Sequence, residues 1–281
     1  MAYEVPGAGA LDYFPCRYGQ SRLVFRGPWR DPAAATAVAL GAEETYGRFV
    51  ARPWPERLEQ ASGQMVLNLG VPSAGPDAWL HEPALLRIAA GARLRFVQVP
   101  GAVNLSNPLY SVHPRRNDRF LSASPRLQRL YPEIDFMDFA FTRHMIRALA
   151  VRGAHRFAEV AQVLGETWLD RMGAVLEALG PRTVLLWFAD RRAPLPGERL
   201  RLAPGAPLLV DTMMLQALRP RVAGLVEVVE RDFFGSSEGK EFGPLEEAAA
   251  RALPGAAAHE AAARALLRWM PKQKGAPKGA P

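Results

Sequence analysis

Two short apolar runs that end at glycines constrain the fold of this chain more than any other feature. Residues 37–40 (AVAL) and 65–69 (MVLNL) each stop at a glycine that small or polar residues follow. Such runs are typical of strands buried on both faces of a sheet. The proline-punctuated segment 53–63 between them is predicted to be a helix, which makes a βαβ unit with parallel strands. Ligands bind such sheets where strands meet the following loops, here residues 41–47 and 70–77.

Three further strands are predicted downstream, at residues 92–101, 182–190 and 225–229. Helical patterns separate or follow them at residues 81–91, 135–151 and 156–179, from Asp211 onward, and twice within residues 243–270. Strands that alternate with helices predict an α/β fold. We expect a flavodoxin-like three-layer αβα sandwich with a five-stranded parallel sheet in the order 2-1-3-4-5.

Composition divides the chain into three parts. Residues 1–36 form an irregular arm rich in arginine and aromatic residues, in which glycines and prolines interrupt any continuous element. Residues 37–270 form a single α/β domain, with an insertion at about 105–135 that is expected to lie over the strand ends, in the manner of a lid. Residues 271–281 (PKQKGAPKGAP) form a low-complexity, disordered tail.

The basic charge of the chain admits two interpretations. The formal net charge is +7, and the basic residues are nearly all arginine, which suits bidentate binding of phosphate, sulfate or carboxylate. Arginines and aromatics in the arm also have the composition of a nucleic-acid-binding segment. The favoured interpretation is that these aromatics pack on the sheet edge while the arginines face water, so nucleic-acid binding is disfavoured.

Several classes of site are disfavoured by what the sequence lacks. Cys16 is the single cysteine, so an internal disulfide or a cysteine-based metal site is excluded. The five histidines are scattered, and no phosphate-binding glycine loop follows a strand, so we expect no metal and no cofactor. No signal-like or membrane-length apolar run is present, which predicts a cytoplasmic protein without membrane contact.

Four segments in order resemble the conserved blocks of GDSL/SGNH hydrolases. Residues 41–47 (GAEETYG) resemble the GDSxTxG block, and residues 68–77 (NLGVPSAGPD) resemble the second block. Residues 101–104 (GAVN) resemble the third block, GxND, and residues 257–267 (AAHEAAARALL) resemble the end of such chains. The resemblance spans about residues 36–270. The segments DYFPCRYGQSRLVFRGP and HPRRNDRF also look like features of a bacterial domain family of unknown function.

The resemblance implies roles for particular residues. Glu43 stands at the serine nucleophile position, with Ala42 where the family has aspartate, and Ala256 stands where an aspartate would precede the histidine. The resemblance then makes Glu43 a nucleophile or general base and His259 a general acid or base. Oxyanion stabilisation falls to the Asn104 side chain and to the backbone N–H of Gly75. Gly41 and Thr45 complete the expected ligand-binding loop.

A second group of residues is predicted to bind an anion if the insertion folds back over the strand ends. His113, Arg115 and Arg116 belong to this group, and Arg143 with His144 form another candidate. The alternative for both is a solvated basic surface.

Two functions stay open on these observations. The first is an SGNH-hydrolase-like enzyme that acts on an ester, an acyl group or a carbohydrate ester at the strand ends. The second is a non-catalytic protein on the same scaffold that binds a sugar or an anionic small molecule. Both expect a small-molecule or carbohydrate ligand, and neither predicts an oligomeric state.

Overall fold

The computed structural model describes residues 9–198, 201–203, 205–230 and 235–272. Within these residues the main sheet has five parallel strands in the order β2-β1-β3-β6-β7, which confirms the predicted fold and strand order. The strands are β1 (Ala37–Gly41), β2 (Val66–Gly70), β3 (Leu94–Gln98), β6 (Thr183–Ala189) and β7 (Gly224–Val229). Most of the predicted tail and the first eight residues of the arm lie outside the described residues.

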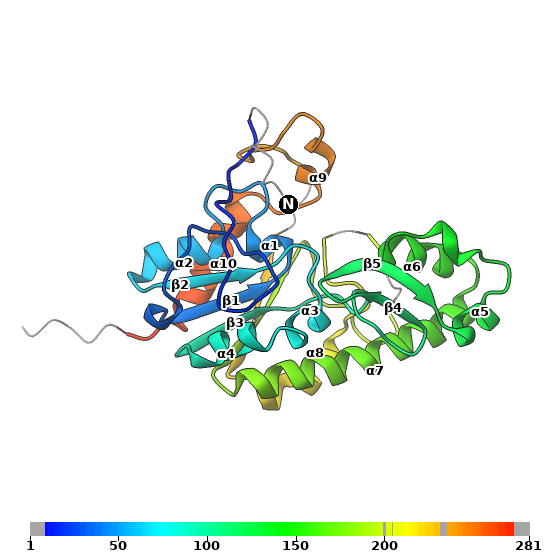
Figure 1. Cartoon of the computed structure of the whole chain (residues 1–281). Coiled ribbons are helices and arrows are strands. Elements are labelled where there is room, and N and C mark those ends of the chain that lie inside the picture. The colour runs from blue at the N-terminus through cyan, green and yellow to red at the C-terminus, as the bar shows by residue number, and fades with distance from the viewer. Residues whose placement is uncertain (1–8, 199–200, 204, 231–234, 273–281) are drawn as a thin grey trace, which may run out of the picture.

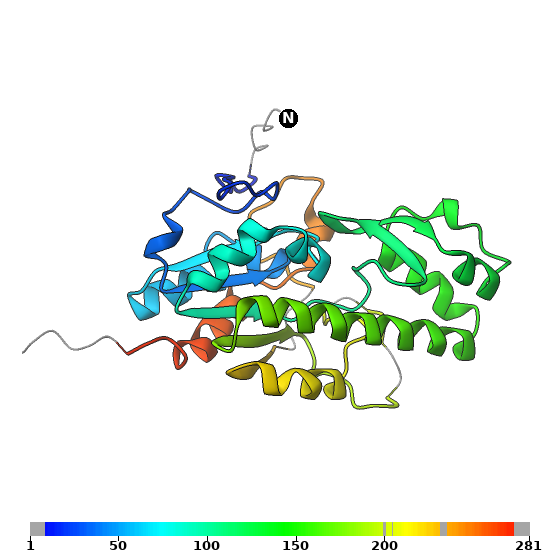
Figure 2. The same ribbon diagram turned by 60° about the horizontal axis from the view of Figure 1, so that its bottom comes forward.

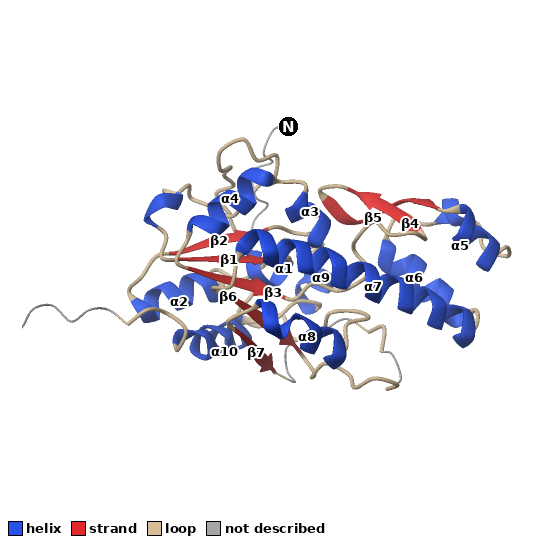
Figure 3. Ribbon diagram, turned by 90° about the horizontal axis from the view of Figure 1, so that it is seen from below, coloured by secondary structure: helices blue, strands red, loops and turns tan. Residues whose placement is uncertain are grey.

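Helices cover both faces of this sheet (Figures 1 and 3). One face carries α2 (Trp54–Ser62) and α10 (Ala256–Leu267). The other carries α3 (Pro76–Leu80), α4 (Pro83–Gly91), α7 (Ala154–Leu179) and α8 (Thr212–Leu218). Alternate side chains of β1 pack into the cores on the two faces of the sheet. Val38 and Leu40 pack on the α7 side, and Ala37 and Ala39 pack on the α2–α10 side. The period-2 alternation of a strand explains why β1 is apolar throughout.

The insertion forms structure of its own at one end of the molecule. A two-stranded antiparallel hairpin, β4 (Tyr110–His113) and β5 (Arg116–Ala123), is followed by α5 (Pro125–Leu130). The 26 residues of α7 span roughly 39 Å, and Figure 2 shows this helix running from beneath the sheet to the hairpin. The ion pair of Arg126 in α5 with Glu159 in α7, at 2.8 Å, and the hydrogen bonds that Asn117 of β5 accepts from the start of α3 join the insertion to the domain.

The remaining short elements flank the strand ends. They are α1 (Glu43–Tyr46), α6 (Thr142–Val151), α9 (Glu247–Arg251) and the 3-10 turns Pro32–Ala34, Phe136–Asp138 and Arg219–Arg221. The predicted helix at residues 135–151 begins only at Thr142. The stretch before it is a short 3-10 turn and then extended chain, in which Phe120 N–H donates to the Ala140 carbonyl at 3.1 Å. Pairing with β5 thus displaces helix at these residues.

The described part of the arm packs on the domain. Tyr18 and Phe25 are buried in the α7-side core, and a bridge joins Cys16 to Phe25. Arg26 is committed to backbone carbonyls that follow α1, at 2.9 Å to Gly47 and 2.6 Å to Ala51. The burial of Tyr18 and Phe25 supports the packing interpretation for these aromatic residues, whereas Arg26 binds backbone carbonyls and does not face water as that interpretation expected.

Among the described helices, none combines the length and apolarity that a membrane crossing requires.

Candidate functional site

A cavity of about 500 Å³ opens at the carboxyl ends of the sheet strands. Its wall is formed by the residues that follow β1, β2 and β3, by Phe188 of β6, by residues 205–208 and by the first two turns of α6. This is the edge at which open parallel sheets bind ligands. The polar residues of the wall are Glu43, Glu44, Arg48, Ser73, Gln98, Asn104, Asp118, Thr142, Arg143, His144 and Arg147.

Glu43 is the most perturbed group of this cavity. It is the first residue of α1, and Ala42 alone separates it from the end of β1. Its Oε1 accepts hydrogen bonds from the Ser73 N–H at 2.9 Å and from the Ser73 hydroxyl at 3.2 Å. Burial, reinforced by the negative charges of Glu44 and Asp118, raises the pKa of Glu43 from 4.5 to about 7. A carboxyl group in this range can both accept and return a proton near neutral pH.

The neighbouring Glu44 is held by a buried network. Gln98, at the end of β3, donates from Nε2 to Glu44 Oε2 at 2.8 Å. The Gln98 Oε1 accepts from both the backbone N–H and the hydroxyl of Thr45. Gly41 permits this packing, because a Cβ there would lie 2.0 Å from Thr45 Oγ1. Thr45 is therefore a buried anchor of α1, and the structure gives Gly41 and Thr45 packing contacts in place of the expected ligand contacts.

Asn104 lies in the cavity wall, as its position after β3 predicts. Its Oδ1 accepts from the Thr142 hydroxyl at 2.7 Å, which ties the loop after β3 to the start of α6. Among the described residues no acceptor is found for its Nδ2, so this amide is available to donate to a ligand. The adjoining Asp118 presents a buried Oδ1 that has no hydrogen-bond partner within the described part of the chain.

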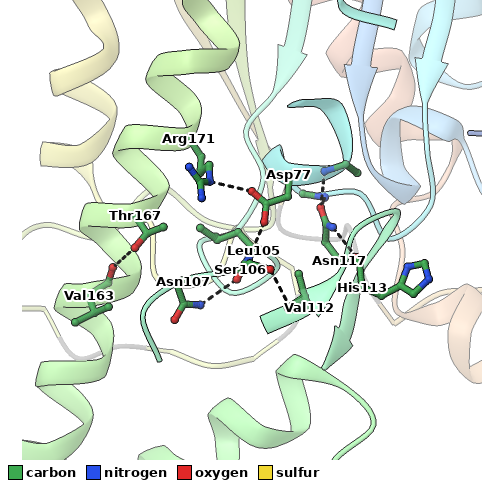
Figure 4. Close-up of polar contacts among 12 residues, drawn as sticks. Asp77, Leu105, Ser106, Asn107, Val112, His113, Asn117, Val163, Thr167 and Arg171 are labelled. Carbon is green, nitrogen blue, oxygen red and sulfur yellow. Dashed lines mark hydrogen bonds and ion pairs between the residues drawn. The ribbon is translucent and has the colours of Figure 1, made fainter. Parts of the chain in front are cut away.

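The backbone N–H of Gly75 is not free for the oxyanion role that the resemblance implies. It donates to Oδ1 of Asn117 at 2.8 Å, and the same oxygen accepts from the Ala78 N–H at 2.9 Å. Asn117 thus satisfies the start of α3 from β5 and also donates to the His113 carbonyl (Figure 4). Gly75 is required here for close packing, since a Cβ would lie 1.9 Å from the Asn104 carbonyl oxygen.

A buried side chain of α3 fixes the loop that carries Asn104. Asp77 accepts from Arg171 Nε of α7 at 3.0 Å and from the Ser106 N–H at 2.7 Å (Figure 4). Ser106 in turn accepts from the Val112 N–H at 3.1 Å. The loop after β3 is therefore held between α3, α7 and the hairpin.

The α6 side of the cavity is basic. Arg48 is paired with Glu246 at 3.1 Å, and Arg147 donates to the Leu202 carbonyl. Within the described residues, the Arg143 side chain makes no ion pair or hydrogen bond. Desolvation, followed by the charge of Arg147, lowers the pKa of Arg143, while Glu44 and Glu43 oppose this shift.

His259 lies away from the predicted catalytic cluster. It occupies the first turn of α10, is 1% exposed, and its Nδ1 accepts the Trp54 N–H at 3.1 Å. Burial and the nearby positive charge of Arg57 lower its pKa from 6.5 to about 3. Phe188 contacts both this ring and the cavity. The imidazole is therefore a neutral acceptor that joins α10 to α2, and the structure does not group it with Glu43. In the sequence His259 belongs to an alanine-rich segment, which forms helix α10 and packs in the α2–α10 core.

The residues of the hairpin that were predicted to bind an anion make contacts within their own turn. His113 Nδ1 accepts the backbone N–H groups of Arg115 and Arg116, at 3.3 and 3.2 Å, which stabilises the turn between β4 and β5. Both arginines are exposed. By contrast, Arg143 and His144 of the second candidate group do line the cavity.

Seven polar wall residues were not singled out from the sequence, namely Glu44, Arg48, Ser73, Gln98, Asp118, Thr142 and Arg147. Ser73 lies inside the second block but had no role in the resemblance, and Asp118 lies inside the basic hairpin segment. Gln98 and Thr142 come from the end of β3 and the start of α6. Position after a strand was the available signal for Ser73, whereas Gln98 lies inside the predicted strand at residues 92–101. Among the described residues, no cluster of three His, Cys, Asp or Glu side chains is arranged to hold a metal ion.

The fold and the cavity define a three-layer α/β protein with a polar, carboxylate-bearing pocket at the carboxyl edge of a parallel sheet. The chain belongs to the family described as a domain of unknown function (DUF6473), whose model matches residues 1–274. No curated protein matches the chain significantly.

Solved structures with a similar course of the chain include lipolytic and acyl-transfer proteins. A lipase from a goat rumen metagenome is 14% identical, with a TM-score of 0.43, over 84% of this chain and 97% of its own. A protein of the G-D-S-L lipolytic family from Desulfitobacterium hafniense is 12% identical, with a TM-score of 0.37, over 83% and 98%. A salicylyl-acyltransferase from a tetracycline biosynthetic pathway is 14% identical, with a TM-score of 0.36, over 86% and 55%.

Proposed function

We propose that this protein hydrolyses or transfers the acyl group of a small ester, with a carbohydrate ester as one candidate, and that Glu43 is the general base. The proposal rests on one observation above all. A carboxyl group with a pKa of about 7 contacts a hydroxyl at 3.2 Å on the wall of a 500 Å³ cavity. General bases are most effective when their pKa lies near the working pH.

The neighbouring groups supply the other parts of acyl transfer. When a nucleophilic oxygen attacks the ester carbonyl, Glu43 takes its proton and later returns a proton to the leaving alcohol. Negative charge develops on the carbonyl oxygen, and the Nδ2 group of Asn104 is the side-chain donor on this wall that can stabilise it. Arg143 adds positive charge on the α6 side. His259 and the Gly75 N–H have no part in this scheme.

Hydrolysis of short p-nitrophenyl esters tests the proposal. Wild type is expected to turn over the acetate or butyrate ester, and Glu43→Gln, which keeps the shape and loses the base, is expected to lose about 100-fold or more in kcat/KM. Glu177→Gln, on the exposed face of α7, is the charge-matched control and should retain wild-type activity. An inert wild type, or a Glu43→Gln variant as active as wild type, would contradict the proposal.

Arg143 favours a second candidate, a protein that binds an anionic sugar or other anionic small molecule without turnover. The side chain lines the cavity and has no ion-pair partner among the described residues. Its guanidinium is therefore available to bind an anionic ligand. Sulfated or phosphorylated sugars should then raise the melting temperature of wild type and not that of Arg143→Gln. Arg129→Gln, in α5, is the matched control. Equal shifts in all three proteins, or none, would remove this candidate.

A further inference from the structure

Ser73 has a backbone conformation that is unusual for a residue with a side chain. It lies between β2 and α3 with φ of 63°, in the left-handed region that side chains other than glycine rarely adopt. Four non-glycine residues in the described chain have positive φ, and the other three, Phe14, Phe49 and Leu209, are apolar. Strain of this kind persists only where neighbouring contacts enforce it, and it gathers at functional sites.

The contacts that enforce this conformation converge on Glu43. The Ser73 N–H and hydroxyl both point at Oε1 of Glu43, at 2.9 and 3.2 Å. On the other side, the Ser73 carbonyl accepts the Asn117 N–H at 2.9 Å, which ties the turn to the hairpin. The outcome is a hydroxyl that lies on the cavity wall and is already hydrogen-bonded to a carboxyl oxygen.

The setting has the geometry of an activated serine. A serine on a strained turn between a strand and a helix, with its oxygen at the carboxyl edge of the sheet and a proton acceptor in contact, is the arrangement that exposes a nucleophile in several hydrolase folds. Here the acceptor is a carboxylate in place of an imidazole. Asn104 lines the same wall as a donor for the carbonyl oxygen.

We propose that Ser73 is the nucleophile of this site and forms a covalent acyl ester during turnover. This inference rests on the proposed function and goes beyond it, because Glu43 alone could equally activate water. The Ser73 Oγ attacks the carbonyl carbon while its proton passes to Glu43. The carbon–oxygen bond to the leaving alcohol breaks, and Glu43 protonates that alcohol. Water then attacks the acyl-Ser73 ester and gives its proton to Glu43, and Ser73 leaves and regains its proton.

A turn-forming role for Ser73 is the alternative, and glycine separates the two. Ser73→Gly removes the hydroxyl and accepts positive φ without strain, so the fold should survive and the melting temperature should stay at or above that of wild type. Loss of ester hydrolysis by about 1000-fold or more is expected of the nucleophile. Ser73→Cys retains a nucleophilic atom and should still be acylated. Ser236→Gly, in an exposed loop, is the control and should behave as wild type.

Covalent labelling gives a readout that a structural role would not move. Wild type is treated with a fluorophosphonate, which phosphonylates activated serines irreversibly, and the adduct is located by peptide mass spectrometry. One adduct at Ser73, absent from Ser73→Gly and much slower in Glu43→Gln, is expected. Ester turnover without an adduct at Ser73, or retained in Ser73→Gly, would overturn this inference and leave Glu43 as a base for water. A wild type that neither turns over esters nor reacts would overturn the proposed function as well.

Discussion

Glu43→Gln is expected to stabilise the folded protein at alkaline pH while it removes activity. Burial holds the pKa of Glu43 near 7 in the folded state, against 4.5 as the ordinary value. Below about pH 4.5 the group is protonated in both states. As the pH rises from 4.5 through 7, the unfolded chain releases the proton first, so the free energy of unfolding of wild type falls. Because one pKa unit corresponds to about 1.4 kcal/mol, the full loss is about 3 kcal/mol.

Glutamine removes the ionisation and keeps the acceptor. Its Oε1 can still accept the N–H and hydroxyl of Ser73, so the substitution should cost little in contacts. The variant should therefore exceed wild type in unfolding free energy by about 3 kcal/mol at pH 8 and by less than about 1 kcal/mol at pH 5. Such a gain on loss of a functional group is typical of active sites.

Urea denaturation at pH 5 and pH 8 measures this difference directly. Wild type, Glu43→Gln and the exposed control Glu177→Gln are unfolded at both pH values, and the three free energies are compared at each. The control should track wild type at both. If the Glu43→Gln variant differs from wild type by the same amount at pH 5 and pH 8, the raised pKa and the chemistry built on it are refuted.

Two further predictions follow from packing at the site and in the opposite core. Gly75→Ala places a Cβ 1.9 Å from the Asn104 carbonyl oxygen and should lower the free energy of unfolding by roughly 2 to 4 kcal/mol. Gly91→Ala, which has open space around it, is the control and should change the free energy of unfolding by less than about 1 kcal/mol. Thermal or urea denaturation measures both. A Gly75→Ala variant as stable as Gly91→Ala would contradict the close contact. His259→Ala should lower the free energy of unfolding by about 2–4 kcal/mol at pH 8. In wild type the free energy of unfolding falls as the pH drops below about 6.5, because the unfolded chain binds a proton at this histidine and the folded state does not. The variant should show a weaker acid-induced loss of stability. Its ester hydrolysis should stay within about threefold of wild type, and a 100-fold loss in a stably folded variant would return His259 to the mechanism.

The fold was readable from the sequence because its strands are buried on both faces. The runs at β1, β2 and β6 are apolar at nearly every position and end at glycine or a polar residue, which leaves little room for another interpretation. The hairpin β4–β5 was read only as an insertion. Its alternating burial, in which Tyr110 and Val112 face inward, is a weaker signal in a segment rich in arginine and proline.

The candidate site could be predicted in the loops that follow the strands. Glu43 and Asn104 were placed by the family resemblance of their segments together with the position of those segments in loops that follow predicted strands. The role of Gly75 was not, because it depends on Asn117, a residue 42 positions away whose side chain takes the N–H. His259 depends in the same way on its contact with Trp54, which is 205 positions away. Motif spacing carries no information about such long-range partners.

The titration of the Glu43 carboxyl group tests the central claim most directly. The ¹³Cδ resonance of glutamate side chains is followed from pH 4 to pH 9, and the Glu43 signal is assigned by its absence from Glu43→Gln. A midpoint near pH 7 is expected from the buried position beside Glu44 and Asp118. A midpoint near 4.5 would mean that the group is an ordinary surface carboxylate, and it would remove the general base from which the proposed chemistry is built.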